Sequence, residues 1–374
     1  MGIAIPPSKI LITGANGYIA AWVVDTLLKT GYTVRGCVRS QDRAKDLEKI
    51  FPQFVADGKL EFAIVGDISR ASVSISETID RLSVLSSQEG AFDAAVTDVD
   101  GIIHMASPVV LDADDPQELI APAIAGTVSI LRSASKERSL KRIVFTSSTA
   151  AVMVPVSEPT TFNESDWNTV SVEAVERLGK QALPMHKYRA SKTLAERAIW
   201  KYLEEHKDTV PWDVVTINPP FVFGPALNDF KGPSQQNATT KMWWDFVIAN
   251  PPSKISVTTF NSYVDVRDVA LAHVLALQKP EAGGQRIIVS AGAFVWQDWF
   301  DIVYTYRSPL KVHIYPHHQE SDGFLPRGLP EVERNRLLAY DNSKSLRILG
   351  PELQYRSMKE TAEDILADCS ARGW

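Results

Sequence analysis

The chain has 374 residues, of which 45% are hydrophobic and 22% are charged, and its formal net charge at pH 7 is −6. This composition is ordinary for a soluble enzyme, and the negative charge argues against nucleic acid as a partner. No apolar run approaches the length that crosses a bilayer, so we expect no membrane partner either.

The N-terminus and the cysteines indicate the compartment. Met1-Gly-Ile-Ala-Ile-Pro-Pro7 has no basic segment, so we expect no signal peptide, and Pro6 stands where a myristoylation signal has Ser or Thr. Cys37 and Cys369 are far apart and form neither a disulfide framework nor a metal-ligand spacing. We expect a cytoplasmic protein that binds no metal.

The first predicted element is the apolar strand Ile10-Leu-Ile12, which runs into a glycine turn and then a helix. Gly14 can take the backbone angles of the turn, and Gly17 has no Cβ to keep a phosphate away. The amides that open the helix would point at the anion. Turns without a ligand also favour glycine, but the strand and helix around this one predict a dinucleotide site that includes Gly14, Asn16, Gly17, Tyr18 and Ile19.

Apolar segments then alternate with segments of helical periodicity. We predict strands at 32–38, 60–65, 101–105, 142–146 and 212–217, and helices at 42–50, 117–135 and 188–206. Such alternation predicts an α/β fold, a doubly wound parallel sheet of the Rossmann type. Each strand is apolar throughout because helices cover both faces.

The regular alternation stops after Asn218. A proline-containing polar stretch follows, and later segments predict a helix at 266–277, a strand at 285–290 and helices beginning at Trp296 and Ser357. We therefore predict a dinucleotide-binding domain at 1–218, with contributions from about 263–292. A smaller substrate-binding lobe would comprise 219–262 and 293–374.

Hydroxyl groups follow the strand 142–146, at the sheet edge where open α/β folds bind ligands. Ser147 and Ser148 could face a cofactor there, or they could simply cap the end of the strand.

Tyr188 and Lys192 are four residues apart, which places the phenol and the ammonium on one helical face. We expect the cation to lower the pKa of Tyr188 from about 10, so that the phenol can exchange a proton with a substrate. The same spacing occurs at Tyr340/Lys344 and Tyr355/Lys359, but only Tyr188 follows the strand-end serines and starts a helix in the nucleotide-binding half, whereas the other two belong to the C-terminal lobe.

The end of the second strand indicates which dinucleotide binds. An acidic residue there would bind the adenosine ribose, but this chain has Arg39, with Arg43 one helical turn later. Two guanidinium groups would meet a 2′-phosphate, which favours NADPH over NADH. The alternative is that both arginines are merely solvated at the start of a helix.

Several motifs carry a resemblance to a known family along nearly the whole chain: Thr13–Ala20, Val38–Arg39, Gly66–Ile68, His104–Pro108, Thr146–Ser148, Tyr188–Lys192, Asn218–Pro225 and Tyr263–Ala270. With these motifs the chain resembles the extended short-chain dehydrogenases/reductases. Within them it is similar to the plant dihydroflavonol reductases and the fungal NADPH-dependent aldehyde and ketone reductases.

The resemblance implies an NADPH-dependent reduction of an aldehyde or ketone to an alcohol, without a metal. Ser148 would polarise the carbonyl group, Tyr188 would donate the proton, and Lys192 would lower the pKa of Tyr188 and hold the nicotinamide ribose. The resemblance further implies cofactor contacts at Asp67, Ile68, Ala106, Ser107, Pro108, Pro219 and Val222.

The segment around 73–88 departs from the family pattern, and we expect it to lengthen a surface helix. Candidates for the lining of an apolar substrate pocket are Val109, Thr149, Phe162, Phe221 and Trp243. Each of the apolar ones could equally be ordinary core. The resemblance is compatible with a monomer or a homodimer.

Two other functions remain open at this point. One is a nucleotide-sugar epimerase or dehydratase of the same fold, which would keep NAD bound, and Arg39 counts against it. The other is an NADPH-sensing protein that has lost catalysis, and the presence of Ser148, Tyr188 and Lys192 counts against that.

Overall fold

The computed structural model describes residues 2–66, 90–107, 113–249, 253–306 and 325–374. The expected surface helix around 73–88 lies outside these residues, as do Asp67, Ile68, Pro108 and Val109. The chain divides into two compact units. The first comprises 1–155, 164–218 and 271–287, and the second comprises 156–163, 219–270 and 288–374.

A parallel sheet forms the centre of the first unit and confirms the predicted Rossmann-type fold. Among the described residues seven strands form this sheet, in the order β10-β7-β5-β4-β1-β2-β3. The strands are β1 (Lys9–Thr13), β2 (Thr33–Val38), β3 (Leu60–Ile64), β4 (Gly101–His104), β5 (Arg142–Thr146), β7 (Asp213–Asn218) and β10 (Arg286–Ile288). β1 pairs in parallel with both β2 and β4, so the strand order reverses there. In open α/β sheets that reversal leaves a crevice at the carboxyl ends of the strands.

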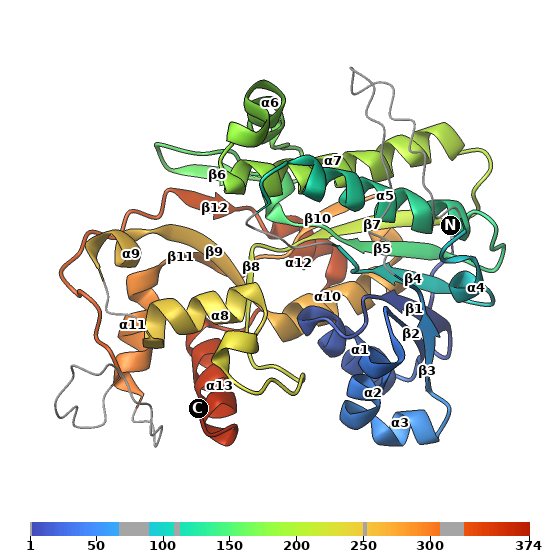
Figure 1. Cartoon of the computed structure of the whole chain (residues 1–374), viewed down its shortest axis with the longest axis horizontal. Coiled ribbons are helices and arrows are strands. Elements are labelled where there is room, and N and C mark those ends of the chain that lie inside the picture. Colours follow the sequence, from blue (N-terminus) through green and yellow to red (C-terminus); the bar gives the residue numbers. More distant parts are fainter. Residues whose placement is uncertain (1, 67–89, 108–112, 250–252, 307–324) are drawn as a thin grey trace. The chain divides into compact units, whose positions relative to one another are not determined.

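Helices cover both faces of this sheet. α5 (Gln117–Ala134) and α7 (Pro184–His206) lie side by side on one face, and α1 (Tyr18–Lys29) lies on the other (Figure 1). The other α-helices among the described residues of this unit are α2 (Gln41–Ile50), α3 (Pro52–Ala56), α4 (Asp93–Val96) and α6 (Thr169–Leu178). α7 begins at Pro184 rather than at Tyr188, because proline at the first helical position loses only an N–H that has no partner within the helix.

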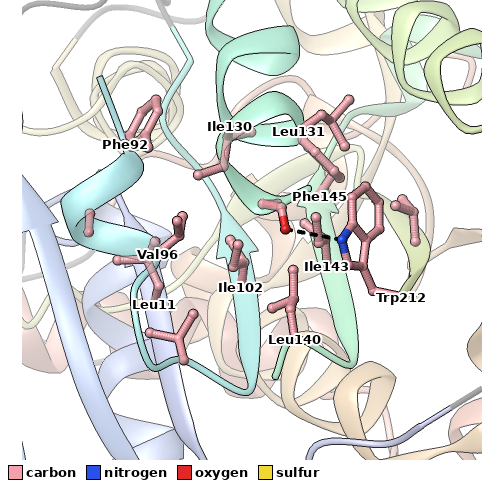
Figure 2. Close-up of a cluster of buried hydrophobic side chains, with 14 of the residues drawn as sticks. Leu11, Phe92, Val96, Ile102, Ile130, Leu131, Leu140, Ile143, Phe145 and Trp212 are labelled. Carbon is pink, nitrogen blue, oxygen red and sulfur yellow. Dashed lines mark hydrogen bonds between the residues drawn. The ribbon is translucent and has the colours of Figure 1, made fainter. Parts of the chain in front are cut away.

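Apolar side chains from neighbouring strands fill the space under α4 and α5. Leu11, Ile102 and Ile143 come from β1, β4 and β5, and Phe92 and Trp212 belong to the same buried cluster (Figure 2). The indole Nε1 of Trp212 donates a hydrogen bond to the carbonyl oxygen of Ala134, 3.3 Å away. This core fixes the carboxyl ends of the strands on which the polar groups described below are mounted.

The second unit has two small sheets and an aromatic core. Within the part of the chain that is described, β8 (Phe221–Phe223), β9 (Phe260–Asp265) and β11 (Gly292–Val295) form one sheet, and β6 (Thr160–Phe162) pairs with β12 (Leu338–Tyr340). Its helices are α8 (Ala238–Trp244), a π-helical turn (Asp245–Ala249), α9 (Lys254–Thr258), α11 (Trp296–Thr305), α12 (Ser343–Leu349) and α13 (Met358–Ala371). α10 (Val266–Gln278) begins in this unit and ends in the first.

The boundaries of the two units differ from the predicted domains at residues 156–163, 263–270 and 288–292, all of which belong to the second unit. Residues 156–163, which we placed in the first domain, belong to the second unit because β6 pairs with β12. Residues 263–270 also belong there, because β9 pairs with β8 and β11. Pairing between strands so far apart leaves no local pattern in the sequence. Across the described residues, no helix is long and apolar enough to cross a membrane.

A buried ion pair joins the amino ends of β5 and β7. Arg142 is 0% exposed, and its Nε and Nη2 donate to the two carboxylate oxygens of Asp213 at 2.6 and 2.9 Å. Its Nη1 donates to the carbonyl oxygens of Ala276 and Lys279. The guanidinium group of Arg142 therefore joins the end of α10 and the loop after it to the sheet.

Replacing one partner of this pair tests its contribution to stability. Asp213→Asn should lower the free energy of unfolding by about 3–5 kcal/mol, because it leaves the guanidinium buried and uncompensated. Urea denaturation followed by circular dichroism measures the change. The double variant Arg142→Met/Asp213→Leu should recover most of the loss, and a cost below about 1 kcal/mol for Asp213→Asn would contradict this account.

Candidate active site

A cavity of about 370 Å³ lies at the carboxyl ends of β1, β2 and β4. Gly14, in its wall, has φ +67°, and a Cβ there would lie 3.1 Å from the Cα of Ala106. A Cβ on Gly17 would lie 3.2 Å from the carbonyl oxygen of Gly14. α1 then begins at Tyr18, so its N-terminal amides follow directly. Bare backbone at a helix N-terminus fits the pyrophosphate of a dinucleotide.

Most of the described residues that we expected to hold the cofactor line this cavity: Gly14, Asn16, Gly17, Arg39, Arg43, Ala106 and Ser107. Tyr18 is only 7% exposed, so it has little beyond its backbone amide to offer a ligand there. Sequence reasoning missed further lining residues: Thr13, Cys37, Val38, Ser40, Val65, Gly66, Phe92 and Met105. Several of them end or follow β1, β2, β3 and β4, so the rule that ligands bind at the carboxyl edge could have found them.

Arg39 and Arg43 are two cations in the cavity wall that could bind the 2′-phosphate of NADPH. Arg39 follows the last residue of β2, and Arg43 is in the first turn of α2, where its guanidinium lies 3.5 Å from the carboxylate of Asp46. Both line the cavity, together with Ser40. Guanidinium groups bind phosphate through paired hydrogen bonds, so the residues present fit NADPH.

The loop after β4 is fixed by Thr13, at the end of β1. The Thr13 hydroxyl accepts hydrogen bonds from the amides of Met105 and Ala106, each at 3.1 Å. It also lies 3.0 Å from Nδ1 of His104, and burial lowers the pKa of that histidine to about 3, with a smaller effect of Lys192. His104 is therefore neutral and acts as a fixed hydrogen-bonding group beside the cavity.

The hydroxyl groups of Ser148 and Tyr188 are hydrogen-bonded to each other. Ser148 precedes a short turn, Thr149–Ala151, and its Oγ also accepts from the amide of Ala150 at 3.1 Å. Lys192 Nζ lies 5.9 Å from the centroid of the Tyr188 ring, and it donates to Oγ of Ser107 at 2.9 Å. Ser148, Tyr188 and Lys192 are not among the residues that line the cavity, but Ser107 is, so the ammonium group of Lys192 is one hydrogen bond away from a lining residue.

The pKa of Tyr188 differs from our expectation. Burial raises it above its ordinary value, and the hydrogen bond with Ser148 only partly opposes this rise. Burial lowers the pKa of Lys192 to about 8. The expected lowering fails because desolvation acts on the phenol directly, while the ammonium group is directed to Ser107.

The predicted substrate residues have different surroundings. Phe162 and Trp243 are 6% and 1% exposed, and they pack in the second unit against Tyr340 and Trp299, respectively. This favours the alternative that both are ordinary core. Thr149 is buried beside Ser148, and Phe221 is partly exposed in β8. Pro219 and Val222 are buried in the second unit, and their contacts with a cofactor stay a prediction.

Comparison with known proteins agrees with this geometry. Residues 10–292 match the model of the NAD dependent epimerase/dehydratase family. The chain belongs to this family. One relative is the NADPH-dependent methylglyoxal reductase of Saccharomyces cerevisiae, which is 35% identical over 95% of this chain and 96% of its own length. Aldehyde reductase 2 of Sporidiobolus salmonicolor is 29% identical over 97% of this chain and 96% of its own length.

Solved structures of family members extend the agreement to the fold. The yeast methylglyoxal/isovaleraldehyde reductase Gre2 complexed with NADPH has a TM-score of 0.77 and 32% identity, over 98% of this chain and 99% of that one. Among the relatives found by sequence alone, a bifunctional dihydroflavonol 4-reductase/flavanone 4-reductase of Malus domestica is 28% identical over 98% of this chain and 91% of its own length. The resemblance to the extended short-chain reductases and NADPH as the cofactor are thereby confirmed.

A pair of glycines allows the close approach at Gly14 to be tested. Gly14→Ala and Gly58→Ala both place a side chain at positive φ, +67° and +66°, and this backbone conformation alone should cost each variant about 1–2 kcal/mol of stability. Only the Cβ at position 14 meets other atoms within 4 Å. Fluorescence titration should therefore show the NADPH Kd rising roughly tenfold or more for Gly14→Ala and staying unchanged for Gly58→Ala. Equal affinities in the two variants would argue against pyrophosphate binding at Gly14.

The choice between NADPH and NADH should depend on Arg39. Arg39→Ala should weaken NADPH binding by roughly 10- to 100-fold while leaving NADH binding nearly unchanged, because the lost guanidinium bonds only the 2′-phosphate. Lys45→Ala is the matched control, since it removes a cation from α2 that forms an ion pair with Asp42. Kd values for both cofactors measure the effect. If Arg39→Ala weakened both cofactors equally, the arginine would have another role.

Proposed function

We propose that this protein reduces small aldehydes and ketones to alcohols with NADPH. The observation that carries the proposal is the hydrogen-bonded hydroxyl pair of Ser148 and Tyr188, with Lys192 beside it and bonded to Ser107, which lines a cavity that fits NADPH. A phenol, a second hydroxyl and a cation held together in this way can donate a proton to a carbonyl oxygen and polarise the C=O bond.

NADPH supplies the hydride when it is bound. The backbone from Gly14 to Gly17 would hold its pyrophosphate, and Arg39 and Arg43 would bind its 2′-phosphate. Lys192 donates a hydrogen bond to Ser107, which lines the cavity. With the cofactor bound, Lys192 would instead donate to a hydroxyl of the nicotinamide ribose. These residues bind and orient a cofactor, and the chemistry at the carbonyl oxygen depends on the hydroxyl pair.

Ser148 and Tyr188 would both donate hydrogen bonds to the carbonyl oxygen and so polarise the C=O bond. As the carbon is reduced, Tyr188 transfers its proton to the oxygen. With its raised pKa the phenol is protonated at neutral pH, as a phenol with an ordinary pKa also is, so it has a proton to transfer. Lys192, with a pKa of about 8, is mostly an ammonium group at that pH and stabilises the phenolate that forms.

The names of the relatives support a small carbonyl compound as the substrate class. The Saccharomyces cerevisiae relative is a methylglyoxal reductase, and an Aspergillus niger protein, 32% identical over 91% of this chain and 92% of its own length, is a ketoreductase. Arg39 disfavours the nucleotide-sugar epimerase alternative, which uses NAD. The grouping of Ser148, Tyr188 and Lys192 disfavours a protein that only senses NADPH.

Initial rates of NADPH consumption over a panel of aldehydes, ketones and dicarbonyls, methylglyoxal and isovaleraldehyde included, test the proposal. Tyr188→Phe should lower kcat about 10²- to 10⁴-fold and leave the NADPH Kd within about twofold, because only the proton donor is lost. Tyr355→Phe is the control. Tyr355 also precedes a lysine by four residues, but its hydroxyl bonds Ser345 in the second unit.

Two results would count against the proposal. The absence of turnover by the wild type over the whole panel would remove the reductase function. Full activity of Tyr188→Phe would keep the function but transfer the role of proton donor to another group.

A further inference from the structure

Glu196 is a buried carboxylate on the same helix as Tyr188 and Lys192. The three residues follow one another at intervals of four along α7, so they share one face of the helix. Glu196 is 1% exposed, and the proposed reaction assigns it no role. An ionised side chain is costly to bury, so its partners indicate what it is for.

Donors from three strand ends surround the Glu196 carboxylate. Oε2 accepts from Oγ of Ser147 at 2.5 Å and from Nδ2 of Asn218 at 2.8 Å. Oε1 accepts from Nε of Arg286 at 2.6 Å and from the hydroxyl of Thr216 at 3.2 Å. Ser147 follows the last residue of β5, Thr216 and Asn218 lie in the second half of β7, and Arg286 is the first residue of β10. One carboxylate therefore joins α7 to three strands of the sheet, and through Ser147 and Asn218 it reaches the carboxyl ends of β5 and β7.

The network reaches the backbone of Ser148 by two routes. Nδ2 of Asn218, besides bonding Glu196, donates to the carbonyl oxygen of Ser148 at 3.2 Å. Ser147, the neighbouring residue, bonds Glu196 through its side chain. Two hydrogen bonds thus fix the backbone around Ser148. One is made by the side chain of Ser147, and the other by the carbonyl oxygen of Ser148.

Arg286 is itself held rigidly, so it gives Glu196 a fixed counter-charge. Its guanidinium carbon lies 3.7 Å from the centroid of the Trp167 ring, and its Nη1 donates to the carbonyl oxygens of Glu164 and Asp166 at 2.6 and 2.8 Å. Stacking on an indole and bonding carbonyl groups leave a guanidinium little freedom. Arg286 therefore holds the Oε1 atom of the carboxylate, while Ser147 and Asn218 hold the Oε2 atom.

We infer that Glu196, acting through Ser147 and Asn218, is a positioning residue that sets the approach of the Ser148 hydroxyl to Tyr188. The inference rests on the proposed reductase function and adds to it a group that touches neither substrate nor cofactor. A displacement of about 1 Å in a reacting group can cost roughly 100-fold in rate. Ser148 follows β5 and Tyr188 lies on α7, and Glu196 joins these two elements. Loss of the Glu196 carboxylate should therefore change the distance between the two hydroxyls and so lower the rate.

The Arg142–Asp213 pair provides a matched control. It is also a buried guanidinium–carboxylate pair that involves β5 and β7, but it lies at the amino ends of these strands. Breaking it should lower stability without moving Ser148. A merely structural Glu196 would behave like Asp213, whereas a positioning Glu196 would change kcat at temperatures where the protein is fully folded.

The experiment compares Glu196→Gln, Ser147→Ala and Asp213→Asn in the full chain, with the carbonyl compound that the wild type reduces fastest. Glu196→Gln keeps the side-chain volume nearly constant but replaces one accepting oxygen with an NH₂ group. That group cannot accept the hydrogen bonds that the surrounding residues donate, so the network is broken. kcat should fall roughly 10- to 100-fold, and the NADPH Kd should stay within about twofold. Ser147→Ala removes one bond to the carboxylate and leaves the buried charge pair intact, so kcat should fall roughly tenfold. Asp213→Asn should lower the melting temperature and leave kcat unchanged.

The inference is overturned if both Glu196→Gln and Ser147→Ala keep kcat within about twofold of the wild type, or if Asp213→Asn loses kcat as they do. Should Glu196→Gln not fold, Ser147→Ala decides alone. A wild type that reduces no carbonyl compound would overturn the proposed function and this inference with it. This outcome differs from a failure of the inference alone, in which the wild type is active and the Glu196→Gln and Ser147→Ala variants are equally active.

Discussion

Parallel pairing of β1, β4, β5 and β7 brings the carboxyl ends of these strands to one edge of the sheet, and the chemistry of the first unit depends on this edge. Thr13 ends β1 and fixes the loop that follows β4. Ser148 follows β5, and Asn218 ends β7 and bonds the Ser148 carbonyl. A shift of one strand relative to the next would separate groups that are now within hydrogen-bonding distance, so the register is a condition for the site.

Buried charge is arranged differently at the two ends of these strands. At the amino end, the guanidinium of Arg142 is paired directly with the carboxylate of Asp213. At the carboxyl end, Glu196 is paired with Arg286, while Lys192 donates to a neutral serine hydroxyl. Desolvation accordingly lowers the pKa of Lys192 to about 8. An ammonium group held by a neutral partner remains available to a ribose hydroxyl and to a developing phenolate, which a carboxylate partner would have prevented.

Much of the fold and of the cofactor site could be predicted from the sequence because the signals are local. The glycine turn, the apolar strands and the arginines after β2 each occupy one short segment. Other features depend on contacts between distant segments, such as the pairing of β6 with β12 and the bond from Arg286 to Glu196. Glu196 does continue the spacing of four from Tyr188 and Lys192, and that pattern could have indicated it. The predicted lowering of the Tyr188 pKa was wrong because no local sequence pattern shows how deeply a side chain is buried. For the same reason, the sequence cannot tell whether an apolar residue such as Trp243 lies in a core or lines a pocket.

The most direct test of the account is to follow the hydride. NADPH deuterated at its hydride-donating carbon would be mixed with the protein and a carbonyl substrate, and the product alcohol would be analysed by mass spectrometry. The account predicts a stoichiometric gain of deuterium on the former carbonyl carbon, with equal consumption of NADPH. Product that forms without net consumption of NADPH would contradict it and would indicate the transient redox cycle of an epimerase.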